Sequence, residues 1–257
     1  MNIKTMIKAA EAAGKLALKY FRSDFLKYET KSSSADLVTE IDIASQNEIL
    51  DVLSKNCPGI PIITEEKNPQ TYPEKYFLVD PLDGTLNYFH GIPLFCVSIA
   101  LVDKGYPVLG VVHVPTFSET FTAEKSKGAY LNSKRIQVSN KLRLEDALCV
   151  TGWPYNKKLH NWTQNAVRKM LEVTQEVRIL GSAALELCYI AAGNLDIYFE
   201  IGLSPWDIAA GYLIASEAGA TVSSISVDGF ELNLGEILAT SPAIYADTLK
   251  ILRKSSE

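Results

Sequence analysis

Cysteine is scarce in this sequence, and the few that are present form no recognisable pair. The four cysteines, Cys57, Cys96, Cys149 and Cys188, include no Cys-x-x-Cys motif. Three of them lie in apolar runs, as buried free thiols commonly do. The pattern therefore predicts unpaired thiols and a protein of the reducing cytoplasm.

Long apolar runs and an excess of positive charge are also missing. The longest apolar run, around Leu94 to Val102, is far shorter than the roughly 20 residues that a membrane-spanning helix needs. A net charge of −5 and a pI near 5.4 argue against nucleic acid or an anionic membrane as the main partner, because such partners need clustered Lys and Arg. Residues 1–21 carry one apolar stripe and no small-residue cleavage site, which predicts a packed first helix rather than a targeting segment.

Several cofactor and catalytic motifs are absent from the chain. There is no Gly-x-Gly-x-x-Gly, no Walker-type Gly-Lys-Thr and no His-Glu-x-x-His, so nucleotide cofactors and zinc peptidase chemistry have no support. The three histidines, His90, His113 and His160, are scattered, and we expect structural or surface roles for them.

The most informative stretch that is present runs from Tyr76 to Pro93. An apolar strand ends there in Asp80 and Asp83, followed directly by Gly84 and Thr85. Two carboxylates so close together repel each other unless a cation lies between them, and oxygen ligands of this kind favour Mg²⁺. The alternative is that both acids only form a turn, with Asp-Gly as a hairpin corner. We expect Pro81 to break the strand ladder at this point.

Two further acid clusters favour the metal site over the turn. Glu65 and Glu66 follow a short β-branched run, and Asp207 stands at the start of an apolar helix expected at 206–218. Haloacid-dehalogenase-type phosphatases share the sequence Asp-Gly-Thr, but their nucleophilic Asp would fall on Pro81. Attack by a metal-activated water is therefore the expected chemistry.

The order of the expected elements predicts a layered α/β architecture. Strands dominate residues 76–138 after two helices, the second at 40–55 with a capping box between Thr39 and Asp42. The remainder alternates, with helices expected at 161–176, 182–192, 206–218 and from Ser241-Pro242 onward, and strands at 177–180, 196–200 and near 222 and 237. We expect one compact unit with a strand-rich half at 1–140 that carries most metal ligands and a second half at 141–257 that completes the active site.

The motif blocks together resemble those of the inositol monophosphatase family. They are Thr64-Glu65-Glu66, Asp80-Pro81-Leu82-Asp83-Gly84-Thr85, Trp206-Asp207-Ile208-Ala209-Ala210-Gly211 and Glu217-Ala218-Gly219, with matching order and spacing from Lys31 to Gly219. The resemblance implies the five-layer αβαβα sandwich of the inositol monophosphatase and fructose-1,6-bisphosphatase type. It also implies dependence on two or three Mg²⁺ ions, lithium sensitivity and a homodimer.

The same resemblance assigns residues. It implies metal binding by Glu65, Asp80, Asp83, Asp207 and the main-chain carbonyl of Leu82. Asp42 and Thr85 would orient and help deprotonate the attacking water, with Glu65 also catalytic; for Asp42 the alternative is helix capping alone. The substrate would contact Asp83, Gly84, Thr85, Gly181, Ser182, Ala183, Glu200 and Asp207. Lys31 and Asp36 match positions near the metal site, Glu66 is at best an outer neighbour of the metals, and Trp206 is expected to pack rather than bind.

The sequence therefore predicts a Mg²⁺-dependent phosphomonoesterase for myo-inositol 1-phosphate or a similar sugar phosphate. Fructose 1,6-bisphosphatase or dual-specificity activity stays open, as does a non-catalytic binding or regulatory protein on the same fold. Acids at every ligand position count against the non-catalytic alternative, because a scaffold gains nothing from carboxylates that repel one another.

Overall fold

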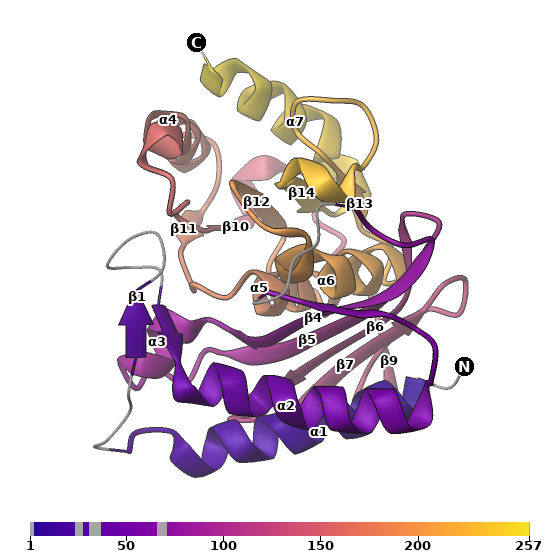
Figure 1. Cartoon of the computed structure of the whole chain (residues 1–257). Coiled ribbons are helices and arrows are strands. Elements are labelled where there is room, and N and C mark those ends of the chain that lie inside the picture. Colours follow the sequence, from indigo (N-terminus) through magenta and orange to yellow (C-terminus); the bar gives the residue numbers. More distant parts are fainter. Residues whose placement is uncertain (1–2, 24–27, 31–36, 66–70, 257) are drawn as a thin grey trace.

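The computed structural model describes residues 3–23, 28–30, 37–65 and 71–256. Their helices and strands stack as five layers, helices, sheet, helices, sheet and helices, as seen in Figure 1. This arrangement confirms the predicted αβαβα sandwich. No described helix combines the length and the apolar character needed to cross a membrane.

The larger sheet has seven strands and belongs to the first half of the chain. It comprises, in spatial order, β3 (Ile62–Thr64), β4 (Lys75–Asp83), β5 (Cys96–Asp103), β6 (Tyr106–Val114), β7 (Glu119–Glu124), β8 (Ala129–Leu131) and β9 (Lys134–Ile136). All neighbouring strands are antiparallel except β3 and β4. Because helices cover both faces, the residues of β4 from Tyr76 onward are all buried, as an uninterrupted apolar strand requires.

Two long helices, α1 (Ile3–Tyr20) and α2 (Glu40–Asn56), cover one face of this sheet (Figure 1). The expected apolar stripe of α1 is buried at residues such as Met6, Ala10 and Ala13. At the start of α2 the predicted capping box is present, because Thr39 and Asp42 bond each other's backbone N–H groups. A short two-stranded sheet, β1 (Tyr28–Thr30) with β2 (Leu37–Thr39), leads into α2.

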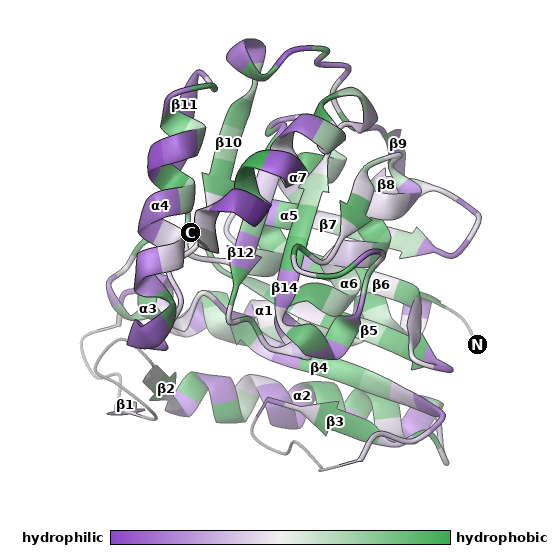
Figure 2. Ribbon diagram, turned by 90° about the horizontal axis from the view of Figure 1, so that it is seen from above, coloured by the Kyte–Doolittle hydropathy of each residue, from purple (hydrophilic) through white to green (hydrophobic). Residues whose placement is uncertain are grey.

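The smaller sheet has five strands, all from the second half of the chain. Its spatial order is β11 (Glu176–Arg178), β10 (Leu148–Thr151), β12 (Ile197–Ile201), β14 (Glu236–Thr240) and β13 (Thr221–Ser223). On the outer side lie α4 (His160–Leu171) and α7 (Tyr245–Arg253), whose hydrophilic and hydrophobic residues alternate in stripes in Figure 2. Single 3₁₀ turns occupy η1 (Leu144–Asp146), η2 (Lys157–Leu159), η3 (Leu232–Leu234), η4 (Pro242–Ile244) and η5 (Lys254–Ser256).

Helices α5 (Ala183–Ala191) and α6 (Pro205–Glu217) fill the layer between the two sheets (Figure 1). Helix α6 packs closely against β6 and against α5 at two glycines, which have no side chain. A Cβ on Gly110 of β6 would lie 2.9 Å from the carbonyl oxygen of Ala210, and one on Gly211 would lie 2.6 Å from Leu187 Cδ1. The predicted boundary between residues 140 and 141 falls between β9 and β10, and the division into two halves stays a prediction.

Three local predictions were wrong. Strand β4 does not end at Asp80: the ladder is interrupted at Pro81, which has no N–H, as expected, but it resumes beyond a β-bulge with Asp83 opposite Cys96. The helix expected at 161–176 ends at Leu171, and Glu176 already belongs to β11. Ser241 does not cap the last helix; its hydroxyl donates to the Lys141 carbonyl, and the turn η4 precedes α7.

Candidate active site

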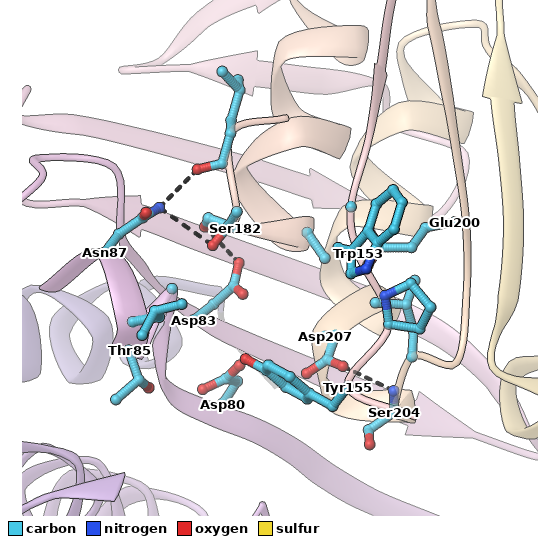
Figure 3. A pocket seen from close by; sticks show the side chains of 18 of the residues that line it. Asp80, Asp83, Thr85, Asn87, Trp153, Tyr155, Ser182, Glu200, Ser204 and Asp207 are labelled. Carbon is cyan, nitrogen blue, oxygen red and sulfur yellow. Dashed lines mark hydrogen bonds between the residues drawn. The ribbon is translucent and has the colours of Figure 1, made fainter. Parts of the chain in front are cut away.

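A pocket of about 560 Å³ opens where the two sheets and the middle helices meet. Its lining comes from the ends of β3 and β4, the start of α3 (Thr85–Phe89), the segments 152–155 and 179–183, and the residues from Glu200 to Asp207. Figure 3 shows Asn87, Ser182 and Asp83 on one side, Asp80 and Asp207 nearer the centre, and Trp153 and Glu200 opposite. The described lining contains five acidic side chains, the four of the predicted metal set and Glu200, and no Lys, Arg or His.

Asp80 is held by the bulge that follows it. Its Oδ1 accepts a hydrogen bond of 3.0 Å from the backbone N–H of Leu82, and the side chain is buried. Burial raises the pKa of Asp80 well above its usual range, and the nearby charges of Glu65, Asp83 and Asp207 raise it further. The three other acids of the predicted metal set thus act on Asp80 electrostatically.

Asp83 joins the two halves of the molecule. Its Oδ2 accepts hydrogen bonds from the Ser182 hydroxyl at 2.6 Å, the Ala184 N–H at 2.8 Å and the Cys96 thiol at 3.4 Å. Burial raises the pKa of Asp83, and these donors oppose that rise because they stabilise the carboxylate. The N-terminus of α5 thus supplies the partial positive charge that this buried acid needs.

Asp207 lies in the first turn of α6 and caps its own helix. Its Oδ2 accepts the Ser204 N–H at 2.8 Å in a capping box. Burial again raises the pKa of the carboxyl well above its usual range, with Asp83 as the largest charge contribution. Glu65 follows β3, where its N–H donates to the Val79 carbonyl at 3.3 Å, and it lines the same pocket.

Asp42 and Thr85 form a direct contact between α2 and α3. The Thr85 hydroxyl lies 2.9 Å from Asp42 Oδ1 and 2.9 Å from the Leu82 carbonyl oxygen. The other carboxylate oxygen, Oδ2, accepts the Thr39 N–H at 2.8 Å. Capping and contact with the threonine are therefore divided between the two oxygens of one buried carboxylate, so the capping role does not exclude the other.

Gly84 makes the tight turn between β4 and α3 possible. It is in the left-handed region, with φ +89°, and a Cβ there would lie 2.8 Å from the Leu94 carbonyl oxygen. Only glycine fits both conditions. Its carbonyl accepts the Tyr88 N–H at 2.9 Å, so α3 starts directly at the wall of the pocket.

Glu200 lies one residue before the end of β12, on the opposite wall. Its Oε2 accepts the Tyr198 hydroxyl at 2.8 Å, and the carboxylate lies against Gly152, where a Cβ would be 2.1 Å from Oε1. Burial raises the pKa of Glu200 to about 7, although hydrogen bonds from Tyr198 and the Gly152 N–H oppose the rise. Burial thus moves the pKa of this acid toward neutral pH.

The structure therefore brings the predicted metal-binding and substrate-binding residues, Gly181, Ser182 and Ala183 included, to the lining of one pocket, with Asp42 directly behind Thr85. Lys31, Asp36 and Glu66 lie outside the described residues. Trp206 packs against the core between the sheets, as expected, and also lines the pocket. The described residues hold no group of three His, Cys, Asp or Glu side chains already arranged to coordinate a metal.

Sequence reasoning missed several side chains of this site. Trp153 and Tyr155 line the pocket from a loop with no motif, where His160 supports them by a 3.0 Å contact from Nε2 to the Pro154 carbonyl oxygen. Glu186 is fully buried behind the wall formed by residues 179–183. One signal for Glu186 was available, because it is the only charged residue in the apolar helix α5.

Architecture and site together define a layered α/β sandwich with a carboxylate-lined pocket between its two sheets. The chain belongs to the inositol monophosphatase family, whose model matches residues 2–257. The predicted resemblance is thus confirmed.

Individual relatives cover nearly the whole chain. The Nus factor SuhB of Pasteurella multocida is 40% identical over 95% of this chain and 92% of its own, and the inositol-1-monophosphatase of Mesorhizobium japonicum is 37% identical over 98% and 96%. Among solved structures, the inositol monophosphatase of Thermotoga maritima has a TM-score of 0.89 and 35% identity, covering 99% of this chain and 97% of that one. The extragenic suppressor protein SuhB of Bartonella henselae has a TM-score of 0.91 and 34% identity, covering 98% of each chain.

The raised pKa of Asp80 predicts how the stability of the protein changes when this acid is replaced. Because the folded-state pKa of Asp80 exceeds the unfolded value, its contribution to stability is complete below the unfolded pKa and is lost as pH rises through the folded pKa. Asp80→Asn keeps an acceptor for the Leu82 N–H without the charge. In chelator at pH 7.5 we expect it to raise the melting temperature by about 2–4 °C, the shift that about 1 kcal/mol causes in a protein of this size.

The advantage of Asp80→Asn should shrink as pH falls toward 5, and the variant should lose most of the stabilisation that Mg²⁺ gives the wild type. Thermal melts with and without Mg²⁺ measure both effects. If Asp80→Asn instead melts at a lower temperature than the wild type at pH 7.5, repulsion between Asp80 and its neighbouring acids does not destabilise the folded protein.

Proposed function

We propose that this protein is a Mg²⁺-dependent phosphomonoesterase that hydrolyses myo-inositol 1-phosphate or a similar sugar phosphate. One observation carries the proposal: carboxylates from three separate parts of the chain line a pocket in which the described residues offer no cationic side chain. A phosphate ester cannot bind beside these acids unless cations enter with it. Family membership and the inositol-1-monophosphatase among the relatives support the same activity.

The donor set fits hard divalent cations. Glu65, Asp80, Asp83, Asp207 and the carbonyl of Leu82 would hold two or three Mg²⁺ ions, and the carboxylates would have to approach one another more closely than they do here. Bound Mg²⁺ would neutralise these acids, lower the pKa of a water and stabilise the leaving alkoxide. Burial and mutual repulsion raise the pKa of both Asp80 and Asp207, as expected for acids built to share cations.

The chain's own residues would do the positioning. Asp42 accepts the Thr85 hydroxyl proton, which leaves the threonine oxygen able to accept a proton from the attacking water. Gly84 and Thr85 present the start of α3 to the phosphate. Glu200, on the opposite wall, would accept hydroxyl groups of the alcohol, together with the segment 181–183.

Two alternatives from the sequence analysis stay open. Fructose 1,6-bisphosphatase or dual-specificity activity needs only a different fit of the alcohol in the same pocket. A non-catalytic binding role is the second candidate function, because several relatives bear the name Nus factor SuhB. A homodimer and lithium sensitivity are proposed on the resemblance alone, and a cytoplasmic location on the unpaired cysteines.

Phosphate release distinguishes these candidates. We expect hydrolysis of inositol 1-phosphate that requires Mg²⁺, stops with chelator and is inhibited by Ca²⁺, whose longer coordination misplaces the water. Lithium should inhibit as well. The panel should include fructose 1,6-bisphosphate and 3′-phosphoadenosine 5′-phosphate. Full activity in chelator would exclude the mechanism, and no hydrolysis of any ester would favour the binding role.

The contact between Asp42 and Thr85 predicts non-additive losses. Thr85→Ala and Asp42→Asn should each lower kcat about 100-fold, the scale of a lost proton-transfer group. The double variant should be little slower than either single one, because residues that act as a unit are not additive. Steady-state kinetics at saturating Mg²⁺ measures this. If the two losses multiply, Asp42 acts only as the cap of α2.

Glu200 predicts a substrate-dependent loss. Glu200→Gln should lower kcat/KM for inositol 1-phosphate about tenfold or more, since hydrogen bonds to charged groups are worth about 1.5–3 kcal/mol. Hydrolysis of p-nitrophenyl phosphate, which offers no such hydroxyl group, should change little.

The two substrates should also differ in pH dependence. Because the pKa of Glu200 lies at about 7, the acceptor form becomes populated as pH rises through that value. The ratio of kcat/KM for the two substrates should rise with it in the wild type and stay flat in Glu200→Gln. Equal losses on both substrates would place Glu200 in support of the metal site instead.

A further inference from the structure

Glu186 is a buried acid that the proposed mechanism does not use. It lies in the first turn of α5 and is 0% exposed. Its Oε1 accepts the backbone N–H groups of Leu180 at 2.8 Å and Gly181 at 3.1 Å. Its Oε2 is buried without a hydrogen-bond partner in the described part of the chain. A carboxyl group is costly in such a place, so its presence needs an explanation.

The two N–H groups belong to a short loop, Leu180 to Ser182, that is also held from its other side. The amide nitrogen of Asn87, in α3, lies 2.7 Å from the Leu180 carbonyl oxygen and 3.3 Å from that of Gly181 (Figure 3). Gly181 has φ +77°, a conformation that favours glycine. Glu186 therefore accepts the loop's N–H groups while Asn87 donates to its carbonyls.

The 180–182 loop ends at Ser182, which contacts the proposed metal ligand Asp83. The Ser182 hydroxyl donates to Asp83 at 2.6 Å, and the Ala184 N–H donates to the same oxygen at 2.8 Å. The outer face of the loop lines the pocket on the side where the alcohol is proposed to bind. A displacement of the loop would therefore change both the partner of Asp83 and the shape of the pocket.

We propose that Glu186 is a positioning residue: its carboxyl group holds the 180–182 loop so that Ser182 stays on Asp83 and the alcohol side of the pocket keeps its shape. The test of this role by kcat and KM rests on the proposed phosphatase function. The test by Mg²⁺ binding does not depend on it. The position requires an acceptor atom, so the amide oxygen of glutamine should replace the carboxylate.

The chain offers a matched control in Glu217. This residue, at the end of α6, accepts the N–H groups of Ser126 at 2.6 Å and Gly128 at 2.8 Å, yet it does not line the pocket. Glu186→Ala and Glu217→Ala each remove one carboxylate that accepts two loop amides. Only the first loop leads to the site.

The experiment compares Glu186→Ala, Glu186→Gln and Glu217→Ala by Mg²⁺ titration of the melting temperature and by kcat and KM on inositol 1-phosphate. We expect Glu186→Ala to raise the half-maximal Mg²⁺ concentration and to lower kcat/KM, each about tenfold, the scale for groups that orient a metal ligand. Glu186→Gln should stay close to wild type. Glu217→Ala should lose stability without either change. If Glu186→Ala does not fold, Glu186→Asp, which keeps the carboxyl but shortens its reach, should change both quantities in the same direction.

The route through Ser182 has its own test. Ser182→Ala should weaken Mg²⁺ binding on its own, and adding Glu186→Ala should weaken it little more, because the two changes break one chain of contacts. Independent losses would overturn that route.

The outcomes separate this inference from the proposed function. If the wild type binds Mg²⁺ but hydrolyses no ester, the phosphatase proposal fails and the titration still decides the role of Glu186. The inference is overturned if Glu186→Ala leaves the Mg²⁺ titration unchanged, if Glu186→Gln behaves like Glu186→Ala, if Glu217→Ala has the same effect, or if the wild type shows no response to Mg²⁺.

Discussion

Repulsion among buried carboxylates is the constraint on which the rest of this structure depends. Burial and neighbouring acids raise the pKa of Asp80 and Asp207 well above their usual range, and burial also raises the pKa of Asp83. Isolated acids would avoid such a place or become neutral. Here each is held by the backbone: a bulge holds Asp80, the start of α5 holds Asp83, and the start of α6 holds Asp207. Both helices are fixed in turn between two sheets, so the scaffold prevents the acids from moving apart.

The same contacts join the two halves of the chain. Asp83 comes from the seven-stranded sheet, whereas Ser182 and Ala184 lie at the start of α5, the helix that precedes β12 of the other sheet. Asn87 crosses the same junction to the carbonyls of Leu180 and Gly181. Because these bonds lie at the pocket, the contacts that hold the two halves together also fix the geometry of the site. A change at the junction therefore alters the site without touching a proposed metal ligand.

Much of the fold and the acid positions could be predicted from the sequence because local patterns encode them. Apolar strands that end in acids placed Asp80, Asp83 and Glu65, and the Thr39–Asp42 capping box needs only four consecutive residues. The bulge at Pro81 was missed because a ladder can resume beyond a proline, which only the partner strand shows. Glu186 was missed because its partners are backbone groups of a loop whose path Asn87 and Gly181 determine. Trp153 and Tyr155 reach the pocket through tertiary packing, for which the sequence has no periodic signal.

The stability cost of the acid cluster bears on the choice between catalysis and binding. A protein that only binds a partner through its surface has no use for buried acids that raise one another's pKa, and replacing them would stabilise it. Activity is the usual reason for keeping an unfavourable site, because charged groups held in place are what stabilise a transition state. A name such as Nus factor among the relatives does not oppose this argument, since one fold can carry more than one function. The cost of holding these acids together is the physical argument for the proposed phosphatase over a role in binding alone.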